Sequence, residues 1–252
     1  MAKYRPFSLS FKIKSPYSLI HSENAYICFV KKTRGAGLKK PSQDRRLYYQ
    51  PIINWGKMMK IAALIIIAVF YAAYLGKKYS QRRKGITTNQ IGKGDKPRKV
   101  LLIENIMGWA TALVIPVEIA SIILHPWLTL SPVLKCCPPL QWTGLVVAAS
   151  GVAFFIIAML TMADSWRAGI PDSDKTTFVQ RGIYRISRNP AFVGFDLIYI
   201  GILMAFPNLI HLVFVIFPVV MLHLQIRQEE EFLRETYGAE YEEYCRKVRR
   251  YI

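Results

Sequence analysis

The stretch Pro190–Ile226, PAFVGFDLIYIGILMAFPNLIHLVFVIFPVVMLHLQI, decides the fold of this chain. From Leu197 onward its last 30 residues contain no Asp, Glu, Lys or Arg. Two membrane-spanning helices need about 40 apolar residues and one needs about 20. Pro207 and Asn208 interrupt the stretch near its middle. Because proline lacks a backbone donor and asparagine favours turns, the stretch predicts a tight helical hairpin.

Three further apolar segments precede this hairpin, namely Met59–Gly76, Asn105–His125 and Trp142–Ala163. The last of them has 22 residues without a charge, enough for a helix of about 30 Å. Gly144, Ala148 and Gly151 give it a face of small residues, which is typical of close helix packing. The sequence therefore predicts an all-α, polytopic membrane helix bundle of about five spans, the last two forming the hairpin.

Basic residues are in large excess, with a formal net charge of +18. Such a charge can indicate nucleic acid. Here, however, the basic residues flank the apolar segments, and no nucleic-acid-binding motif accompanies them. The loop Lys77–Lys99 carries nine basic residues, which places it in the cytoplasm. Asp164–Pro190 and the C-terminus then lie on the same side. We expect a multi-pass protein of a bacterial inner membrane with no nucleic-acid partner.

Residues 1–57 differ from the rest of the chain. They contain 12 of the 34 basic residues and no apolar periodicity. A basic tail on the outer side would conflict with the orientation that Lys77–Lys99 sets. We expect residues 1–57 to be a basic extension that is disordered or, in preference, not translated, with translation starting at Met58 or Met59. The membrane domain is then 58–252.

The four cysteines are Cys28, Cys136, Cys137 and Cys245. No Cys-x-x-Cys motif is present, and the four histidines do not combine with these cysteines at a metal-binding spacing. We therefore expect neither a metal site nor a disulfide.

The C-terminal segment 227–252 has a helical pattern of its own. Its aromatic and apolar residues recur at steps of four, four, three and four: Leu233, Tyr237, Tyr241, Tyr244 and Val248. The expected i,i+4 ion pairs are Glu230–Arg234, Glu242–Arg246 and Glu243–Lys247. Gly238 interrupts the pattern and can divide it into two short helices. The pattern is typical of an amphipathic cytoplasmic helix on the membrane surface.

A polar stretch, RGIYRISRNP, ends at Pro190, directly before the hairpin. Pro190 keeps Asn189 out of the α region and is itself a good first residue of a helix. Arg185, Arg188 and the free N–H groups of that helix either anchor its end at the membrane surface or hold an anion.

Three glutamates, Glu229–Glu231, directly follow the second leg of the hairpin. A hairpin brings them back toward Arg188 and Asn189. Acids and arginines at the end of a hairpin predict a polar cleft at the cytoplasmic membrane surface.

At this point the sequence resembles the membrane methyltransferases that include isoprenylcysteine carboxyl methyltransferases and phospholipid N-methyltransferases. The resemblance covers about residues 178–251. Before the hairpin it is carried by Gly182, Tyr184, Arg188, Asn189, Pro190, Phe192 and Gly194; after it, by Glu229, Glu230, Leu233, Tyr237, Gly238, Tyr241 and Tyr244, with Val248 and Arg250 beyond. Two positions depart from the family pattern. Asn189 stands where histidine is usual and cannot titrate, and Phe192 stands where tyrosine is usual and lacks the hydroxyl.

The resemblance implies S-adenosyl-L-methionine (SAM) as cofactor, bound between the hairpin and the C-terminal tail. The residues expected to bind it are Tyr184, Arg188, Asn189, Pro190, Phe192, Gly194, Glu229 and Glu230, and the expected catalytic residues are Arg188, Asn189 and Glu230. Arg188 suits the carboxylate of the cofactor. Glu230 is the preferred partner of its ammonium group or a ribose hydroxyl, and no metal is expected.

The function that the resemblance implies is methyl transfer to a lipidic or prenylated small molecule or protein in the bilayer. O-methylation of an isoprenylcysteine-type carboxylate is favoured, because a carboxylate needs no deprotonation and Asn189 cannot accept a proton. Phospholipid N-methylation and a steroid-reductase-like oxidoreductase that uses NADPH are the alternatives. Glu118, an acid inside a predicted span, would fit a transporter or the lining of a lipid cavity.

Overall fold

The computed structural model describes residues 44–128, 138–170 and 177–252. Its α-helices are α1 (Asp44–Arg83), α2 (Arg98–Leu128), α4 (Pro138–Met162), α5 (Pro190–Ala205), α6 (Leu209–Tyr237) and α7 (Ala239–Lys247). Two 3₁₀ turns, η1 (Ala163–Ser165) and η2 (Gly182–Arg185), precede α5. In the described ranges the only extended pairing is one isolated bridge between Asn89 and Ala168. The predicted all-α class is confirmed.

Four helices in the described part of the chain are long and apolar enough to cross a membrane: Gly56–Arg83, Arg98–His125, Pro139–Ser165 and Leu209–Tyr237. The fifth predicted span is α5, which has only 16 residues and rises about 24 Å. The bundle therefore consists of four long apolar helices and one short one.

The helix α1 begins at Asp44, so it runs through the boundary that the sequence suggests at residue 57. Residues 1–43 lie outside the described residues, as do Cys28, Cys136 and Cys137. The proposal that 1–57 is a separate extension stays a prediction.

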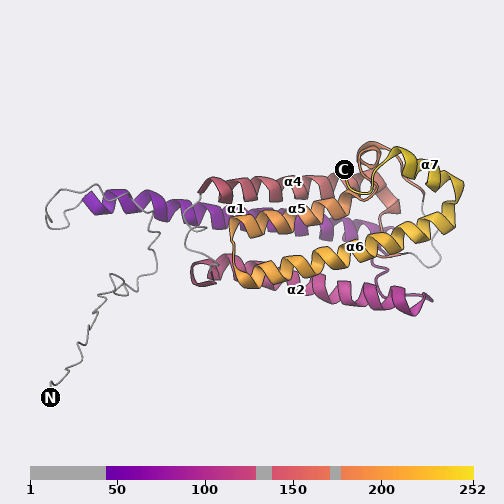
Figure 1. The fold of residues 1–252 in the computed structure, drawn as a ribbon, viewed down its shortest axis with the longest axis horizontal. Helices are drawn as coiled ribbons and strands as arrows, with labels where there is room; N and C mark the ends of the chain where they lie inside the picture. The colour runs from indigo at the N-terminus through magenta and orange to yellow at the C-terminus, as the bar shows by residue number, and fades with distance from the viewer. Residues whose placement is uncertain (1–43, 129–137, 171–176) are drawn as a thin grey trace, which may run out of the picture.

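The helices pack as two groups (Figure 1). In one, α5 lies along α4, with α1 beside them; in the other, α6 lies along α2. The loop between α5 and α6 lies at one end of the bundle, and α7 and the C-terminus lie at the other. The two legs of the hairpin thus belong to different groups. The first residue of α5 and the last residue of α6 both lie at the end of the bundle where α7 lies.

Glycines allow α4 and α5 to touch backbone to backbone. A Cβ atom on Gly201 would lie 2.4 Å from the backbone nitrogen of Ala148, and one on Gly194 would lie 2.8 Å from the carbonyl oxygen of Gly151. Only glycine fits at such distances, and this close approach increases the van der Waals contact that holds helices together in lipid. The predicted small-residue face is confirmed as a helix-packing surface.

The predicted hairpin turn is also confirmed. Asn208 caps α6, because its Oδ1 accepts a hydrogen bond of 2.7 Å from the backbone N–H of His211. From α4, Gln141 Nε2 donates to the carbonyl of Ala205 at 3.1 Å. The turn therefore has hydrogen-bond partners within the protein, which is what lipid requires of irregular backbone.

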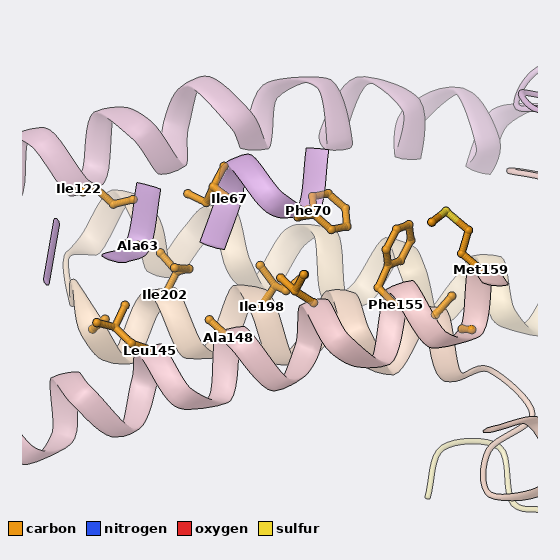
Figure 2. Close-up of a cluster of buried hydrophobic side chains, with 14 of the residues drawn as sticks. Ala63, Ile67, Phe70, Ile122, Leu145, Ala148, Phe155, Met159, Ile198 and Ile202 are labelled. Atoms are coloured by element: carbon orange, nitrogen blue, oxygen red, sulfur yellow. The ribbon is translucent and has the colours of Figure 1, made fainter. Parts of the chain in front are cut away.

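Apolar side chains, among them the rings of Phe70 and Phe155, fill the core where α1, α4 and α5 meet (Figure 2). Phe155 lies at the centre, with its ring centroid 4.8 Å from that of Phe70, 5.1 Å from that of Phe195 and 5.5 Å from that of Trp166. These edge and tilted contacts are the arrangements that aromatic pairs prefer. They fix α1 against the α4–α5 pair.

The stripe of the C-terminal segment packs on the protein itself. Gly238, with φ +51°, ends α6 and turns the chain into α7. The rings of Tyr237, Tyr241 and Tyr244 then surround Phe178, with centroid distances of 4.8, 5.7 and 5.3 Å. The expected interruption at Gly238 is present, but the residues before it are the end of the long helix α6 and not a separate short helix. The tyrosine stripe packs α7 against the segment that precedes α5.

Of the predicted ion pairs in this segment, Glu243–Lys247 is formed, with 2.5 Å between Oε1 and Nζ. The predicted pair Glu230–Arg234 is wrong. Arg234 Nε instead lies 2.5 Å from Oε1 of Glu242, because the turn at Gly238 brings α7 back alongside the end of α6.

Candidate functional site

The start of α5 has the geometry that the sequence predicts. Pro190 is the first residue of the helix, and Asn189 before it has φ −128° and ψ 51°, outside the α region. Ser187 supports this corner, since its Oγ accepts a hydrogen bond of 3.1 Å from the backbone N–H of Asn189. Asn189 and Ser187 are both buried, so the corner is part of the packed structure.

The acids after α6 meet this corner, as predicted. Nδ2 of Asn189 donates to Oε1 of Glu230 at 3.1 Å, and Nη2 of Arg188 lies 3.5 Å from the same oxygen. These residues are about 40 positions apart in sequence and are brought together by the hairpin. The Glu230 side chain is only 4% exposed, so its charge depends on these partners.

A third segment, which sequence reasoning did not assign to the site, completes the cluster. Arg250 donates to Oε2 of Glu230 from Nη2 at 2.8 Å and from Nε at 3.0 Å. The backbone N–H of Arg188 donates to the carbonyl of Arg249 at 2.9 Å. Both oxygens of Glu230 are therefore occupied by protein partners. In the sequence, the only indication that Arg250 belongs to the site was its place in the C-terminal part of the family pattern.

The departure at position 189 has a structural explanation. Besides its bond to Glu230, Nδ2 of Asn189 donates to the carbonyl of Arg250 at 3.2 Å. A neutral histidine has a single N–H and could serve only one of these acceptors. Asn189 thus joins α5, α6 and the C-terminal segment through hydrogen bonds alone.

Two buried tyrosines extend the connection to α7. The hydroxyl of Tyr244 donates to the carbonyl of Tyr184 at 2.6 Å. Burial, and to a lesser degree the nearby Glu229, raises the pKa of the Tyr184 hydroxyl, and burial also raises the pKa of Tyr244. Both hydroxyls therefore remain protonated and can donate. Nη1 of Arg188 contacts Sγ of Cys245 on the same helix.

A cavity of about 360 Å³ lies between α1, α2, α5 and α6. Six of the eight predicted cofactor-binding residues line it: Tyr184, Arg188, Asn189, Pro190, Phe192 and Glu229. Gly194 instead faces α4, as described above. Glu230 lines a second, more polar cavity of about 720 Å³ between the start of α2 and the end of α6.

The loop before α2 forms one wall of the first cavity through Ile91. Glu104 of α2 holds this loop, because it accepts hydrogen bonds from the backbone of Gly92 at 2.7 Å and of Ile170 at 3.0 Å. It also pairs with Lys96 at 2.8 Å, and both side chains are almost fully buried. Sequence reasoning missed Glu104, whose partners lie up to 66 residues away.

Arg188 lines the first cavity, and its Nε has no hydrogen-bond partner among the described residues. The same holds for Oε1 of Gln225, and both atoms are buried. Gln225 also donates from Nε2 to Oε1 of Glu229 at 3.0 Å, which orients that carboxylate. Since buried polar atoms are normally paired, these atoms suit a bound polar molecule. A charged donor, an acid and aromatic faces are thus available to a zwitterionic ligand with an aromatic part.

Comparison with known proteins identifies the region. Residues 140–240, which include α4 and α5, the corner at Asn189 and the acids after the hairpin, match the phospholipid methyltransferase family. The predicted family is confirmed for this region. Two rice proteins, from Oryza sativa subsp. indica and subsp. japonica, are named "Probable protein-S-isoprenylcysteine O-methyltransferase". Each is 32% identical to this chain over 113 residues, which cover 43% of this chain. The chain spans 58% of the length of these curated relatives.

Proposed function

We propose that this protein transfers a methyl group from SAM to a lipidic or membrane-embedded acceptor. The observation that carries the proposal is the first cavity. It joins a polar end at Arg188, Asn189 and Glu229 to an interior lined mainly by apolar side chains of α1 and α2. A water-soluble donor and a lipid acceptor need such a site, polar at one end and apolar at the other. The family match over residues 140–240 supports the same reaction.

The residues at the polar end fit the chemical groups of SAM. Arg188, with a free buried Nε, would bind the carboxylate. We assign the ammonium to Glu229 in place of Glu230, because both oxygens of Glu230 already accept hydrogen bonds within the protein. The rings of Tyr184 and Phe192 line the cavity and would contact the adenine or the sulfonium.

SAM supplies an electrophilic methyl group on a positively charged sulfur. The residues of this chain would bind and orient the two reactants and keep water out. Asn189 contributes fixed hydrogen bonds and takes up no proton. Glu230, Arg250 and Asn189 hold the corner of α5 in place and act as positioning residues.

An acceptor that is already deprotonated fits this site best. Asn189 offers no base, so a carboxylate of the isoprenylcysteine type is the favoured acceptor. This is also the substrate that the names of the rice relatives give for those proteins. Phospholipid N-methylation is the second candidate, and the family description names a phospholipid as the methylated substrate. This reaction would require loss of a proton from the amine first. We further propose that the polar end faces the cytoplasm of a bacterial inner membrane.

The test is incubation of the purified full chain, in a total lipid extract supplemented with a farnesylcysteine analogue, with methyl-labelled SAM. We expect label in a lipid-soluble product. Treatment with base separates the candidates, because a methyl ester releases its label as methanol and an N-methyl group keeps it. Titration with NADPH in parallel tests the steroid-reductase-like alternative. Binding of NADPH without binding of SAM would overturn the proposal.

A further inference from the structure

The first cavity extends well beyond the residues that would hold the cofactor. From Asn189 and Glu229 it continues along α5 to Tyr199 and along α2 to Glu118. Tyr199 follows Asn189 by ten residues on a helical rise of 1.5 Å each, so it lies about 15 Å deeper in the bundle. The cavity therefore has a second polar position, far from the expected point of methyl transfer.

Glu118 is the polar group at this deep end. It is 3% exposed, and its Oε1 has no hydrogen-bond partner in the part of the chain that the structure describes. Tyr71 of α1 and Tyr199 of α5 line the same cavity. Thr111, which also lines the cavity on α2, already donates its hydroxyl to the carbonyl of Met107 at 2.9 Å.

No structural role explains Glu118. A buried carboxyl oxygen without a partner disfavours folding. Glu118 lies outside the family-matched region 140–240, and in the described part of the chain no group of three or more acids, histidines and cysteines could hold a metal ion. Glu118 lines the cavity, so a ligand that brings a donor to its carboxyl group would satisfy it.

We propose that Glu118 determines acceptor specificity by accepting a hydrogen bond from a hydroxyl or ammonium group on the acceptor. That group would lie about 15 Å from the end that receives the methyl. The inference rests on the proposed function, since it assigns the deep part of the cavity to the methyl acceptor. A pure hydrocarbon chain, such as the prenyl chain of farnesylcysteine, leaves Glu118 unpaired. Among carboxylate acceptors, one with a second polar group part way along its chain should therefore bind more tightly than a prenylated one.

The test measures binding of two isomeric probes to the full chain in detergent micelles without SAM. The probes are 12-hydroxyoctadecanoate and 2-hydroxyoctadecanoate, which differ only in whether the hydroxyl lies far along the chain or beside the carboxylate. We expect the wild type to bind the 12-hydroxy isomer about tenfold more tightly, the scale of one hydrogen bond. Glu118→Leu should bind both isomers equally. Thr111→Val, which alters the same cavity wall, should keep the tenfold preference.

A third probe, 12-aminooctadecanoate, separates the two donors. Glu118→Gln keeps an acceptor oxygen but no charge. If a hydroxyl is the natural donor, Glu118→Gln should still prefer the 12-hydroxy probe over the 2-hydroxy probe. The wild type should then bind the 12-amino probe no more tightly than the 12-hydroxy probe. A wild-type preference for the amine that is lost in Glu118→Gln identifies an ammonium group, and either pattern supports the proposal.

Equal binding of the two hydroxy isomers by the wild type overturns the inference, as does a full preference in Glu118→Leu. Thermal unfolding checks that the variants are folded, and removal of an unpaired buried carboxyl should not lower Tm. Because binding is measured without cofactor, failure of this inference is distinct from failure of the proposed function, which would appear as no labelled product with any acceptor.

Discussion

Glu230 and Arg250 form a two-point ion pair in which Nη2 and Nε lie 2.8 and 3.0 Å from one carboxylate oxygen. The pair closes a loop of 20 residues that contains α7. It fixes the segment after α7 against the start of α5, where Arg249 and Arg250 also accept hydrogen bonds from Arg188 and Asn189. The C-terminal segment is therefore a structural part of the candidate site.

Removing each partner of this pair should have unequal effects. Glu230→Ala leaves the mostly buried Arg188 without its acid, which we expect to cost about 3–5 kcal/mol of unfolding free energy. Arg250→Ala should cost about 1 kcal/mol, because Arg250 is 39% exposed and Glu230 keeps its other partners. Denaturant unfolding in detergent measures both. Equal losses would show that Arg188 does not depend on Glu230.

Asn189 should tolerate histidine better than an apolar residue. Asn189→His keeps one donor and should weaken SAM binding by about 1 kcal/mol, whereas Asn189→Leu removes both and should cost about 2–3 kcal/mol. Isothermal titration with SAM gives both values. If the two variants bind equally weakly, the two hydrogen bonds of Asn189 are not what orders the corner.

Two neighbouring glutamates offer a matched comparison for the cofactor. Glu229 lines the first cavity and is oriented by Gln225, while Glu231 is exposed. Glu229→Gln should weaken SAM binding by about 1.5–3 kcal/mol, the range for hydrogen bonds to charged groups, and Glu231→Gln should leave it unchanged. A larger effect at Glu231 would place the cofactor in the second cavity.

The contact between α4 and α5 should not accept a side chain. Gly201→Val would bring Cβ against the backbone of Ala148 and should cost about 1–3 kcal/mol or more, with a lower Tm in detergent. Gly76→Ala is the control, because nothing lies within 4 Å of a Cβ there and alanine favours α1 by about 1 kcal/mol. A Gly201→Val protein as stable as wild type would mean that the two helices can separate.

Glu104 should hold the loop before α2 in place. Glu104→Leu leaves the buried Lys96 without its acid and removes the acceptor of two backbone N–H groups. Hydrogen exchange across residues 85–97 should therefore become faster. Asp164→Asn is the control, since its pair with Lys84 at the start of that loop is 55% exposed and worth at most about 1 kcal/mol. Unchanged exchange in Glu104→Leu would contradict the role.

Local sequence signals were sufficient for much of the fold. The Pro207-Asn208 turn, the small residues of α4 and the tyrosine stripe of the C-terminal segment each depend on neighbours in sequence, and the structure has all three. The contact between Glu230 and Asn189 could also be predicted, because a hairpin returns the chain to the side of the membrane on which it started. These features need no knowledge of distant packing.

Pairings over long distances could not be read from sequence. The i,i+4 rule predicts an ion pair between Glu230 and Arg234, but such a pair contributes only about 0.2–0.5 kcal/mol. Glu230 instead makes buried contacts with Asn189 and Arg250. Glu104 begins an apolar segment and bonds backbone groups 12 and 66 residues away, for which no local pattern exists. Every residue type has a backbone carbonyl, so the sequence does not reveal that the carbonyl of Arg249 accepts a hydrogen bond.

The short length of α5 has a consequence for the surrounding lipid. Its 16 residues rise about 24 Å, whereas the hydrocarbon layer of a bilayer is about 30 Å thick. With the start of α5 at one headgroup layer, the chain reverses before it reaches the other. Hydrophobic mismatch of this kind compresses the adjacent leaflet. Membrane thickness therefore influences how deeply α5 lies in the bilayer. It also influences how far the first residues of α5 are exposed to water.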